Sequence, residues 1–487
     1  MNLAFVAALW RALQHSTGGR QSAATPRRIM AKREAVHEFR RVFYLVLFLL
    51  CLLTGAAFGE QRFPPPEFES GYQLPATQTP PARALLLEYL DVAVLVAALG
   101  LASWLVFKKR SRQGVYALSI FSLIYFGFYR EGCVCAIGSL QNVTLALFDR
   151  GYAVPTVVTA FFVAPLAVSL FAGRAFCAAV CPHGALQDLV LLKPLKVPSW
   201  LEQGLSVLPY VYLGAAVLFA ATGSAFVICE WDPFVPLFRM SGSFTMLLLG
   251  AAFLLLGMFV GRPYCRFLCP YGALLRLGAT VSKWRVTITP DFCTQCRLCE
   301  NACPYGAIQE PASNPASPRA LFADRKRLAW LLALLPLLLV CGGWTGSKLS
   351  TAASRLNRTV TLAEQYAGKE TTLIHAGPRT AADLALFRAG QSPIELLTAA
   401  TDIRRRFVLG GWLFGAWVGL VIGVKLISLS LRRRRADYEP DRAACLACAR
   451  CFEYCPNERV RLGLLPAGAP GTVLVAPETK VCAATTR

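Results

Sequence analysis

The chain has 487 residues, of which 55% are hydrophobic, and its mean hydropathy is +0.48, values that exclude an ordinary soluble protein. Apolar runs such as LVLFLLCLLTGAAF and LLLGAAFLLLGMFVG approach or reach the length of about 20 residues that crosses a bilayer, so we expect a polytopic α-helical membrane protein. The net charge of +22 comes largely from basic residues beside such runs, as in FKKRSR, DRKR and LRRRRAD, which is the positive-inside pattern and excludes nucleic acid as a partner.

About eight transmembrane spans are predicted, in chain order at 42–59, 85–107, 114–130, 152–172, 205–228, 244–261, 328–344 and 407–431. The residues before the first span are mixed in character and lack the pattern of a signal peptide. With that basic arm in the cytoplasm, most basic loops also fall on the cytoplasmic side. Arg404, Arg405 and Arg406 precede the last span on the outer side and run against this orientation.

Two segments of the membrane part repeat each other without a gap. FAGRAFCAAVCPHGALQDL (171–189) and FVGRPYCRFLCPYGALLRL (259–277) both follow a span that ends on the cytoplasmic side. A weaker echo, GCVCAIGSLQNV, starts at Gly132. Duplicated helical units place equivalent groups around a shared centre in many membrane proteins, and we expect the same here.

The repeats contain four cysteines in CxxxCP runs: Cys177, Cys181, Cys265 and Cys269. Thiols at i and i+4 share one face of a helix, so four of them could hold a metal ion or a further cluster, or form redox-active disulfides. The alternative is that these motifs only pack helix ends, because cysteine is often simply buried.

A second group of cysteines is expected on the outer side, at Cys133, Cys135 and Cys229. Electrons that leave the cytoplasm must cross about 30 Å of hydrocarbon, so an intermediate carrier or a diffusible quinol is needed. These three thiols are candidate metal ligands for that step, against buried cysteines or a disulfide. Acids beside them, Glu131, Glu230 and Asp232, are candidate acceptors of quinol protons. Cys51, Cys341 and Cys482 are isolated.

The strongest motif is CTQCRLCENACP, from Cys293, which recurs as CLACARCFEYCP from Cys445. The spacing C-x2-C-x2-C-x3-C-P wraps three thiolates around a [4Fe-4S] cluster and directs the fourth to another cluster. Zinc is the alternative, but the four-cysteine run with its proline favours iron and sulfur. One predicted cluster takes Cys293, Cys296, Cys299 and Cys455, and the other takes Cys445, Cys448, Cys451 and Cys303.

Exchanged ligands require both runs on one side of the membrane, and two spans separate them. We therefore predict a cytoplasmic bacterial-type two-[4Fe-4S] ferredoxin module that is split by a transmembrane hairpin. The expected parts are a basic cytoplasmic arm (1–41), a six-span membrane domain (42–280), a first ferredoxin half (281–324), the hairpin with its periplasmic loop (325–431), a second ferredoxin half (432–465) and a C-terminal tail (466–487).

The last span carries Gly411, Gly415, Gly419 and Gly423 at intervals of four residues. On a helix these glycines lie along one face and allow close approach of another helix. Packing within this chain is the plain interpretation, and a subunit interface is the alternative. Histidine-ligated haem is not expected, because the chain has only four histidines and no CxxCH motif.

These motifs resemble the membrane and iron–sulfur part of the NosR/NirI family, and more distantly the NapH-type membrane ferredoxins. The resemblance rests on GRPYCRFLCPYGA, REGCVC, GGWLFGAWVGLVIGVKLI and RRRRADYEPDRAACLACARCFEYCP, and runs from about residue 40 to 465. It implies the eight ferredoxin cysteines as cluster ligands and carries over the four CxxxCP cysteines. It also implies electron donation, from the quinol pool, to a periplasmic reductase, usually nitrous oxide reductase.

The chain departs from that family in one respect. NosR-type members carry a periplasmic flavin-binding domain with FMN attached to threonine, and here the loops are too short for one. LGAT (277–280) lacks the preceding Ser/Thr of an attachment pattern, so no covalent FMN is assigned. Any flavin would belong to a separate subunit, or another carrier would replace it.

The sequence therefore predicts an electron-transfer protein of the bacterial inner membrane with two [4Fe-4S] clusters and, on the other cysteines, an additional thiolate-bound metal or cluster. It would be a component of an electron-transfer chain rather than a stand-alone enzyme. The alternative is a redox sensor or a maturation factor for a metalloenzyme. A transporter fits least, because the spans contain few charges of the kind that mark an ion path.

Overall fold

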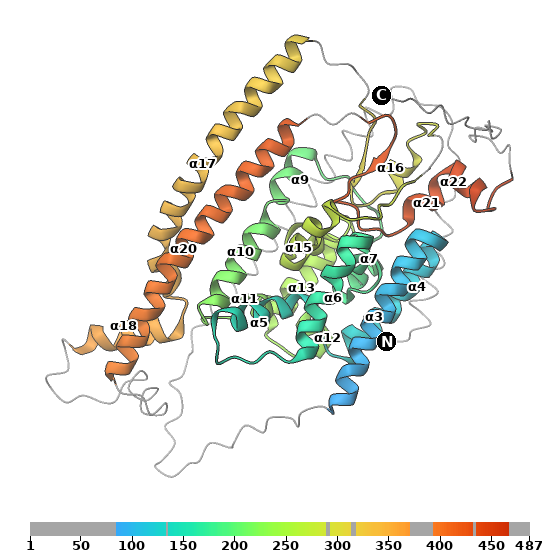
Figure 1. Cartoon of the computed structure of the whole chain (residues 1–487). Coiled ribbons are helices and arrows are strands. Elements are labelled where there is room, and N and C mark those ends of the chain that lie inside the picture. The colour runs from blue at the N-terminus through green and yellow to red at the C-terminus, as the bar shows by residue number, and fades with distance from the viewer. Residues whose placement is uncertain are drawn as a thin grey trace, which may run out of the picture. The chain divides into compact units, whose positions relative to one another are not determined.

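The structure of the chain is a computed structural model that describes residues 84–132, 135–288, 293–312, 318–370, 393–431 and 435–466. The chain divides into two compact units, Met1–Leu53 and Thr54–Arg487, and every described residue belongs to the second. The elements, labelled in Figure 1 where space allows, are α3 (Leu85–Trp104), the π-helix η1 (Leu105–Lys109), α4 (Arg112–Ser122), the π-helix η2 (Leu123–Tyr129), α5 (Ala136–Phe148), α6 (Thr156–Ala172), α7 (Ala175–Ala179), α8 (Pro182–Leu189), α9 (Ser199–Leu205), α10 (Leu208–Ala221), α11 (Val227–Glu230), α12 (Val235–Arg239), α13 (Phe244–Gly257), α14 (Pro263–Phe267), α15 (Pro270–Thr280), α16 (Leu298–Ala302), β1 (Ile308–Gln309), α17 (Pro318–Ser354), α18 (Arg358–Glu370), α20 (Pro393–Ser430), β2 (Glu439–Pro440), α21 (Arg450–Tyr454) and α22 (Pro456–Arg461).

Four helices in these ranges are long and apolar enough to cross a membrane: Leu85–Lys109, Ser199–Ala221, Asp324–Ser354 and Ile394–Ser430. Three other predicted spans fall in shorter helices, namely 114–130 in α4 and η2, 152–172 in α6 and 244–261 in α13. The 17 residues of α6 and the 14 of α13 extend about 26 Å and about 21 Å, less than the ~30 Å of a hydrocarbon core. The predicted span 42–59 lies outside the described residues, so the total of about eight stays a prediction.

Each of the two sequence repeats forms two short helices that follow an apolar helix, so the repeated unit has three helices. An apolar helix (α6 or α13) leads into a short helix that holds the first cysteine (α7 or α14), and a third helix (α8 or α15) begins directly after the second cysteine. Proline stands at the first position of both third helices, where its missing N–H costs no hydrogen bond. The weak echo folds similarly, because α5 begins directly after Cys135.

The hairpin between the two cysteine-rich runs consists of α17 and α20, which lie side by side in Figure 1. Glycines let their backbones meet: a Cβ at Gly415 would collide with the carbonyl oxygen of Gly342, and a Cβ at Gly419 with that of Leu338. The glycine stripe therefore packs within the chain, as its plain interpretation predicts. On another side of α20, Trp417 Nε1 donates a hydrogen bond to Tyr210 O of α10 at 2.8 Å.

Gly415→Ala is expected to destabilise the protein by about 1–3 kcal/mol. The added methyl group would overlap the carbonyl oxygen of Gly342, and relieving this overlap requires α17 and α20 to move apart. The measurement is the thermal unfolding midpoint in detergent. Gly423→Ala is the graded control, since its methyl meets only the side-chain end of Leu335, and Gly100→Ala meets nothing within 4 Å. Equal midpoints for Gly415→Ala and Gly100→Ala would contradict this account of the hairpin.

The three arginines that oppose the predicted orientation lie on α20, near the end of the hairpin where α18 packs. α20 has 38 residues and extends about 57 Å, so it projects well beyond a ~30 Å hydrocarbon layer. Arg404 lies on this helix and forms an ion pair with Glu364 of α18 at 2.7 Å. A small apolar cluster that includes Val360 and Leu396 joins α18 to α20 at the same end.

The segments before and after the hairpin meet again in a two-stranded antiparallel sheet. Ile308 pairs with Pro440 and Gln309 with Glu439, and an isolated bridge joins Ala312 to Arg435. The short helices α16 and α21, one from each cysteine-rich run, contact each other. Two stretches on either side of a membrane-length hairpin thus form one small module.

Candidate functional site

The first set of ferredoxin cysteines surrounds a single cavity. Its lining comprises Ile288, Cys293, Thr294, Cys296, Arg297, Cys299, Tyr438 and Cys455. Three of the thiols come from the first run and one comes from the second. Cys299 interacts electrostatically with Cys293, Cys296 and Cys455. The structure therefore brings together the four residues that spacing alone groups as one ligand set.

The second set gathers in the same exchanged manner. Cys303, from the first run, interacts electrostatically with Cys448. Cys451 interacts most strongly with Cys445, then with Cys448 and Cys303, and least with Cys299 of the first set. Burial raises the pKa of Cys299 to about 12 and that of Cys445 to about 12. Burial alone therefore disfavours the thiolate form that a metal ligand must take.

The two loops share one backbone design. Gln295 and Arg297 have φ of +51° and +64°, and Ala447 and Ala449, at the matching positions, have φ of +54° and +60°. Side chains with a Cβ rarely adopt this left-handed conformation, and such residues cluster at functional sites. The conformation curls each run so that its first three cysteines face one point.

No group of three or more His, Cys, Asp or Glu side chains within the described ranges has the geometry of a single-ion site. The four thiolates around a cubane each bind a different iron, so they stand further apart than the ligands of one ion. Both exchanged sets fit that chemistry by residue type, number and position.

The four CxxxCP cysteines form a third set. Cys177, Cys181, Cys265 and Cys269 are all buried, and Cys269 interacts electrostatically with the other three. Hydrogen-bond donors point at their sulfurs: Gln187 Nε2 lies 3.2 Å from Cys265 Sγ, and the backbone N–H of Gly272 lies 3.2 Å from Cys269 Sγ. The two sequence repeats thus place equivalent thiols together in the protein interior.

The Gly-Arg pair of each repeat has a role that the sequence motifs did not reveal. Arg262, from the second repeat, packs over Gly184 of the first, where a Cβ would lie 2.8 Å from Nη1. Arg174, from the first repeat, lies over Gly272 of the second, 3.5 Å from such a Cβ. Each arginine therefore covers the glycine of the other CPxG motif. The occurrence of Gly-Arg in both copies was the available signal.

These arginines differ in how their charge is balanced. Arg262 forms a buried ion pair with Asp188, with Nη2 2.7 Å from Oδ2. Arg174 is 2% exposed, yet within the described part of the chain neither it nor Arg276 forms an ion pair with an acidic side chain. Arg174 Nη2 instead lies 3.8 Å from Cys177 Sγ. Buried charges are normally paired, so this environment suits an anionic group on the thiols.

The third set lies beside the ferredoxin module. Arg174 Nη1 donates to the carbonyl oxygen of Ala443 at 3.4 Å, two residues before Cys445. Arg112 Nη1 donates to the carbonyl oxygen of Cys448 at 3.3 Å. The phenol of Tyr305, which follows the first run, donates to Asp188 at 2.8 Å.

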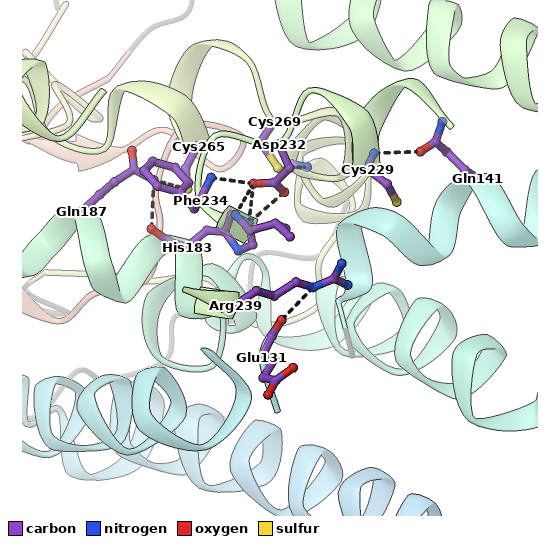
Figure 2. Close-up of polar contacts among 12 residues, drawn as sticks. Glu131, Gln141, His183, Gln187, Cys229, Asp232, Phe234, Arg239, Cys265 and Cys269 are labelled. Atoms are coloured by element: carbon purple, nitrogen blue, oxygen red, sulfur yellow. Dashed lines mark hydrogen bonds and ion pairs between the residues drawn. The ribbon is translucent and has the colours of Figure 1, made fainter. Parts of the chain in front are cut away.

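The predicted separation between the CxxxCP thiols and the outer cysteines is wrong. One cavity is lined by both Cys135 and Cys181, and His183 Nε2, next to the first CxxxCP run, lies 2.9 Å from Asp232 Oδ2 (Figure 2). The physical reason is that the helices around them are too short to hold these groups a bilayer apart. Periodicity in the sequence does not distinguish such short helices from complete spans.

Cys229 also belongs to this region. Its backbone N–H donates to Gln141 Oε1 of α5 at 3.3 Å (Figure 2), and that of Ile228 donates to the same oxygen at 3.0 Å. Cys135 interacts electrostatically with Asp232 and Cys229.

The remaining candidates take no part in these sets. Glu131 accepts a bond from Arg239 Nε through its backbone oxygen, Glu230 ends α11, and Cys341 is exposed on α17. Cys133, Cys51 and Cys482 lie outside the described residues.

Comparisons with known proteins identify iron–sulfur domains in part of the chain. A family model described as a 4Fe-4S binding domain matches residues 154–198, 243–288 and 299–326, and a second model with the same description matches 286–309. Protein NirI of Paracoccus denitrificans is 36% identical over 153 residues, which cover 28% of this chain and 22% of NirI.

Two further relatives extend the comparison. An uncharacterized protein of Methanocaldococcus jannaschii is 30% identical over 37% of this chain and 77% of its own length. The regulatory protein NosR of Pseudomonas aeruginosa is 27% identical over 41% of this chain and 30% of NosR. The chain thus spans less than a third of NirI and of NosR. No solved structure matches it.

Proposed function

We infer that this chain, a member of the NosR/NirI family of membrane iron–sulfur proteins, passes single electrons between the quinol pool or the cytoplasmic face and a periplasmic reductase. Iron–sulfur electron transfer follows from the matching 4Fe-4S models and the family. The observation that supports a two-cluster ferredoxin module is that each cysteine run contributes its fourth cysteine to the other set. Cys455 joins the first run, and Cys303 joins the second. A bacterial inner membrane location with the module in the cytoplasm completes the proposal.

The protein's own residues would hold two [4Fe-4S] clusters. Cys293, Cys296, Cys299 and Cys455 are the proposed ligands of one, and Cys445, Cys448, Cys451 and Cys303 are those of the other. Such clusters supply one-electron transfer when bound. Backbone N–H groups aimed at the ligand sulfurs, such as that of Ala447 at 3.4 Å from Cys445 Sγ, would adjust the cluster potentials.

A third centre is proposed on Cys177, Cys181, Cys265 and Cys269. Three observations support it: all four thiols are buried together, donors point at their sulfurs, and two buried arginines nearby have no acidic partner among the described residues. The 4Fe-4S family model also covers both CxxxCP repeats. Arg174 contacts this set and the loop before Cys445, so it would hold the third centre beside the ferredoxin module.

Partners are proposed from the family. A periplasmic redox protein, with nitrous oxide reductase as the first candidate, would receive the electrons, quinol would supply them, and any flavin would be on a separate subunit. A regulatory or maturation function is the second candidate, because the NosR relatives are named regulatory proteins. Sustained turnover of reduced quinol with an electron acceptor would distinguish the first from the second.

The test is the content of iron and acid-labile sulfide in anaerobically purified protein. Wild type is expected to contain clearly more than about eight irons per chain, and Cys181→Ser to lose the excess. Cys341→Ser, at an exposed cysteine of α17, is the matched control and should keep the full content. About eight irons in wild type would contradict the third centre, and zinc in place of iron would contradict the whole proposal.

A further inference from the structure

The two ferredoxin sets differ in their distance from the membrane part of the chain. The cysteines of the second set pack against the same hydrophobic core that contains the four CxxxCP cysteines. Cys299, of the first set, belongs instead to a separate small cluster around Tyr438, and Cys296 is exposed. Cys303 and Cys451, of the second set, pack against both the core and the small cluster. The second set therefore lies between the first set and the CxxxCP cysteines.

Arg174 connects the second set to the CxxxCP set. Its Nη1 donates a hydrogen bond to the carbonyl oxygen of Ala443, two residues before Cys445, at 3.4 Å, and its Nη2 lies 3.8 Å from Cys177 Sγ. The guanidinium also interacts electrostatically with Cys445 and with Cys265. A single charged group thus acts on thiols of both sets.

The charge of this guanidinium is not balanced by the protein around it. Arg174 is buried, and no acidic side chain among the described residues forms an ion pair with it. Its Nε is buried and has no hydrogen-bond partner in the same part of the chain. Arg276, which interacts electrostatically with Arg174, adds a second positive charge. A buried charge of this kind is stabilised by negative charge nearby, and its effect is strong because the interior has a low dielectric constant.

We propose that Arg174 is a positioning residue for electron transfer, which holds the membrane centre against the second ferredoxin cluster and raises the midpoint potentials of both. The inference rests on the proposed third centre and adds the order of the route: the membrane centre exchanges electrons with the second cluster, and the second cluster exchanges them with the first. In each step one centre loses one electron, the other gains it, and no bond breaks. Reduction adds negative charge beside Arg174, so the guanidinium stabilises the reduced form of both neighbours.

The experiment is a redox titration of the EPR signals of the anaerobically purified full chain. Arg174→Gln should lower the midpoint potentials of the second cluster and of the membrane centre by about 59 mV or more, a tenfold change in a one-electron equilibrium, and leave the first cluster unchanged. Arg174→Lys keeps the charge and should restore most of both potentials. Lys196→Gln is the control: Lys196 pairs with Glu300 of the first run but is 57% exposed, so water screens its charge and all three potentials should stay unchanged.

A second measurement does not depend on the folding of an Arg174 variant. Cys299→Ser should keep the second cluster, whose spin relaxation should be accelerated by the membrane centre and should slow when Cys181→Ser is added. Cys303→Ser should keep the first cluster, on which the added Cys181→Ser should have a much smaller effect. Equal effects on the two clusters, or midpoint potentials that Arg174→Gln leaves unchanged, would overturn the proposal. Failure of the third centre itself is distinguishable, because Cys181→Ser alone would then leave the iron content unchanged.

Discussion

Replacing Cys303 by serine is expected to remove about four irons per chain, and they should be those of the cluster held mainly by the second run. The reason is the exchange seen in the structure: Cys303 lies with Cys445, Cys448 and Cys451 although it is only four residues from Cys299. EPR of the reduced protein should give the same remaining signal for Cys303→Ser and Cys448→Ser. Iron analysis supplies the number lost.

The matched control is Cys299→Ser, in the same run but in the other set. It should leave the signal that Cys303→Ser removes, and remove the signal that Cys303→Ser leaves. If the two neighbouring substitutions abolish the same signal, the exchanged ligand sets are incorrect and each run holds its own metal.

Asp188→Asn is expected to destabilise the protein by about 3–5 kcal/mol, because it leaves the guanidinium of Arg262 buried without its counter-charge. Asp188 also accepts the phenol of Tyr305 at 2.8 Å and lies 3.6 Å from Arg112 Nη2. Tyr305 follows the first cysteine run, and Arg112 donates a hydrogen bond to the carbonyl oxygen of Cys448 in the second run. The variant should therefore lose its clusters at a lower temperature than wild type. Thermal unfolding and loss of visible absorbance measure the two effects.

Glu364→Gln is the control for this substitution, since Glu364 also faces two arginines, Arg355 and Arg404. These side chains are 32–63% exposed, and water and salt screen exposed ion pairs, so the loss of stability should be far smaller than for Asp188→Asn. A similar loss of stability in both variants would show that burial of the Asp188 pair is not the cause.

The ferredoxin sets were accessible from the sequence because the spacing of four cysteines and a proline encodes loop geometry locally. Once the two runs are identified, the chemistry of exchange decides which distant thiol joins which set. The packing role of the glycine stripe in the last helix could also be predicted, since residues four apart lie on one helix face. In both cases the pattern that allows the prediction lies within a short stretch of sequence.

The membrane site was less predictable because its contacts join residues that no local pattern connects. Asp232 and His183 are 49 residues apart, and only the packing of short helices brings them together. A hydropathy pattern counts apolar residues, and it treats α13 and a complete span alike. Cys135 and Cys181 were therefore assigned to opposite sides although they share one cavity.

The insertion of the hairpin between the two runs has a consequence for biosynthesis. Ribosomes add about 5–20 residues per second, so the codon for Cys455 is read roughly 8–30 s after that for Cys299. During this interval the first run lacks its fourth ligand, and the second run does not yet exist. Under the proposed ligand sets neither cluster can be completed until both helices of the hairpin have been made and inserted. A nascent or truncated chain therefore stays without clusters, and iron enters only a protein that has already acquired its topology.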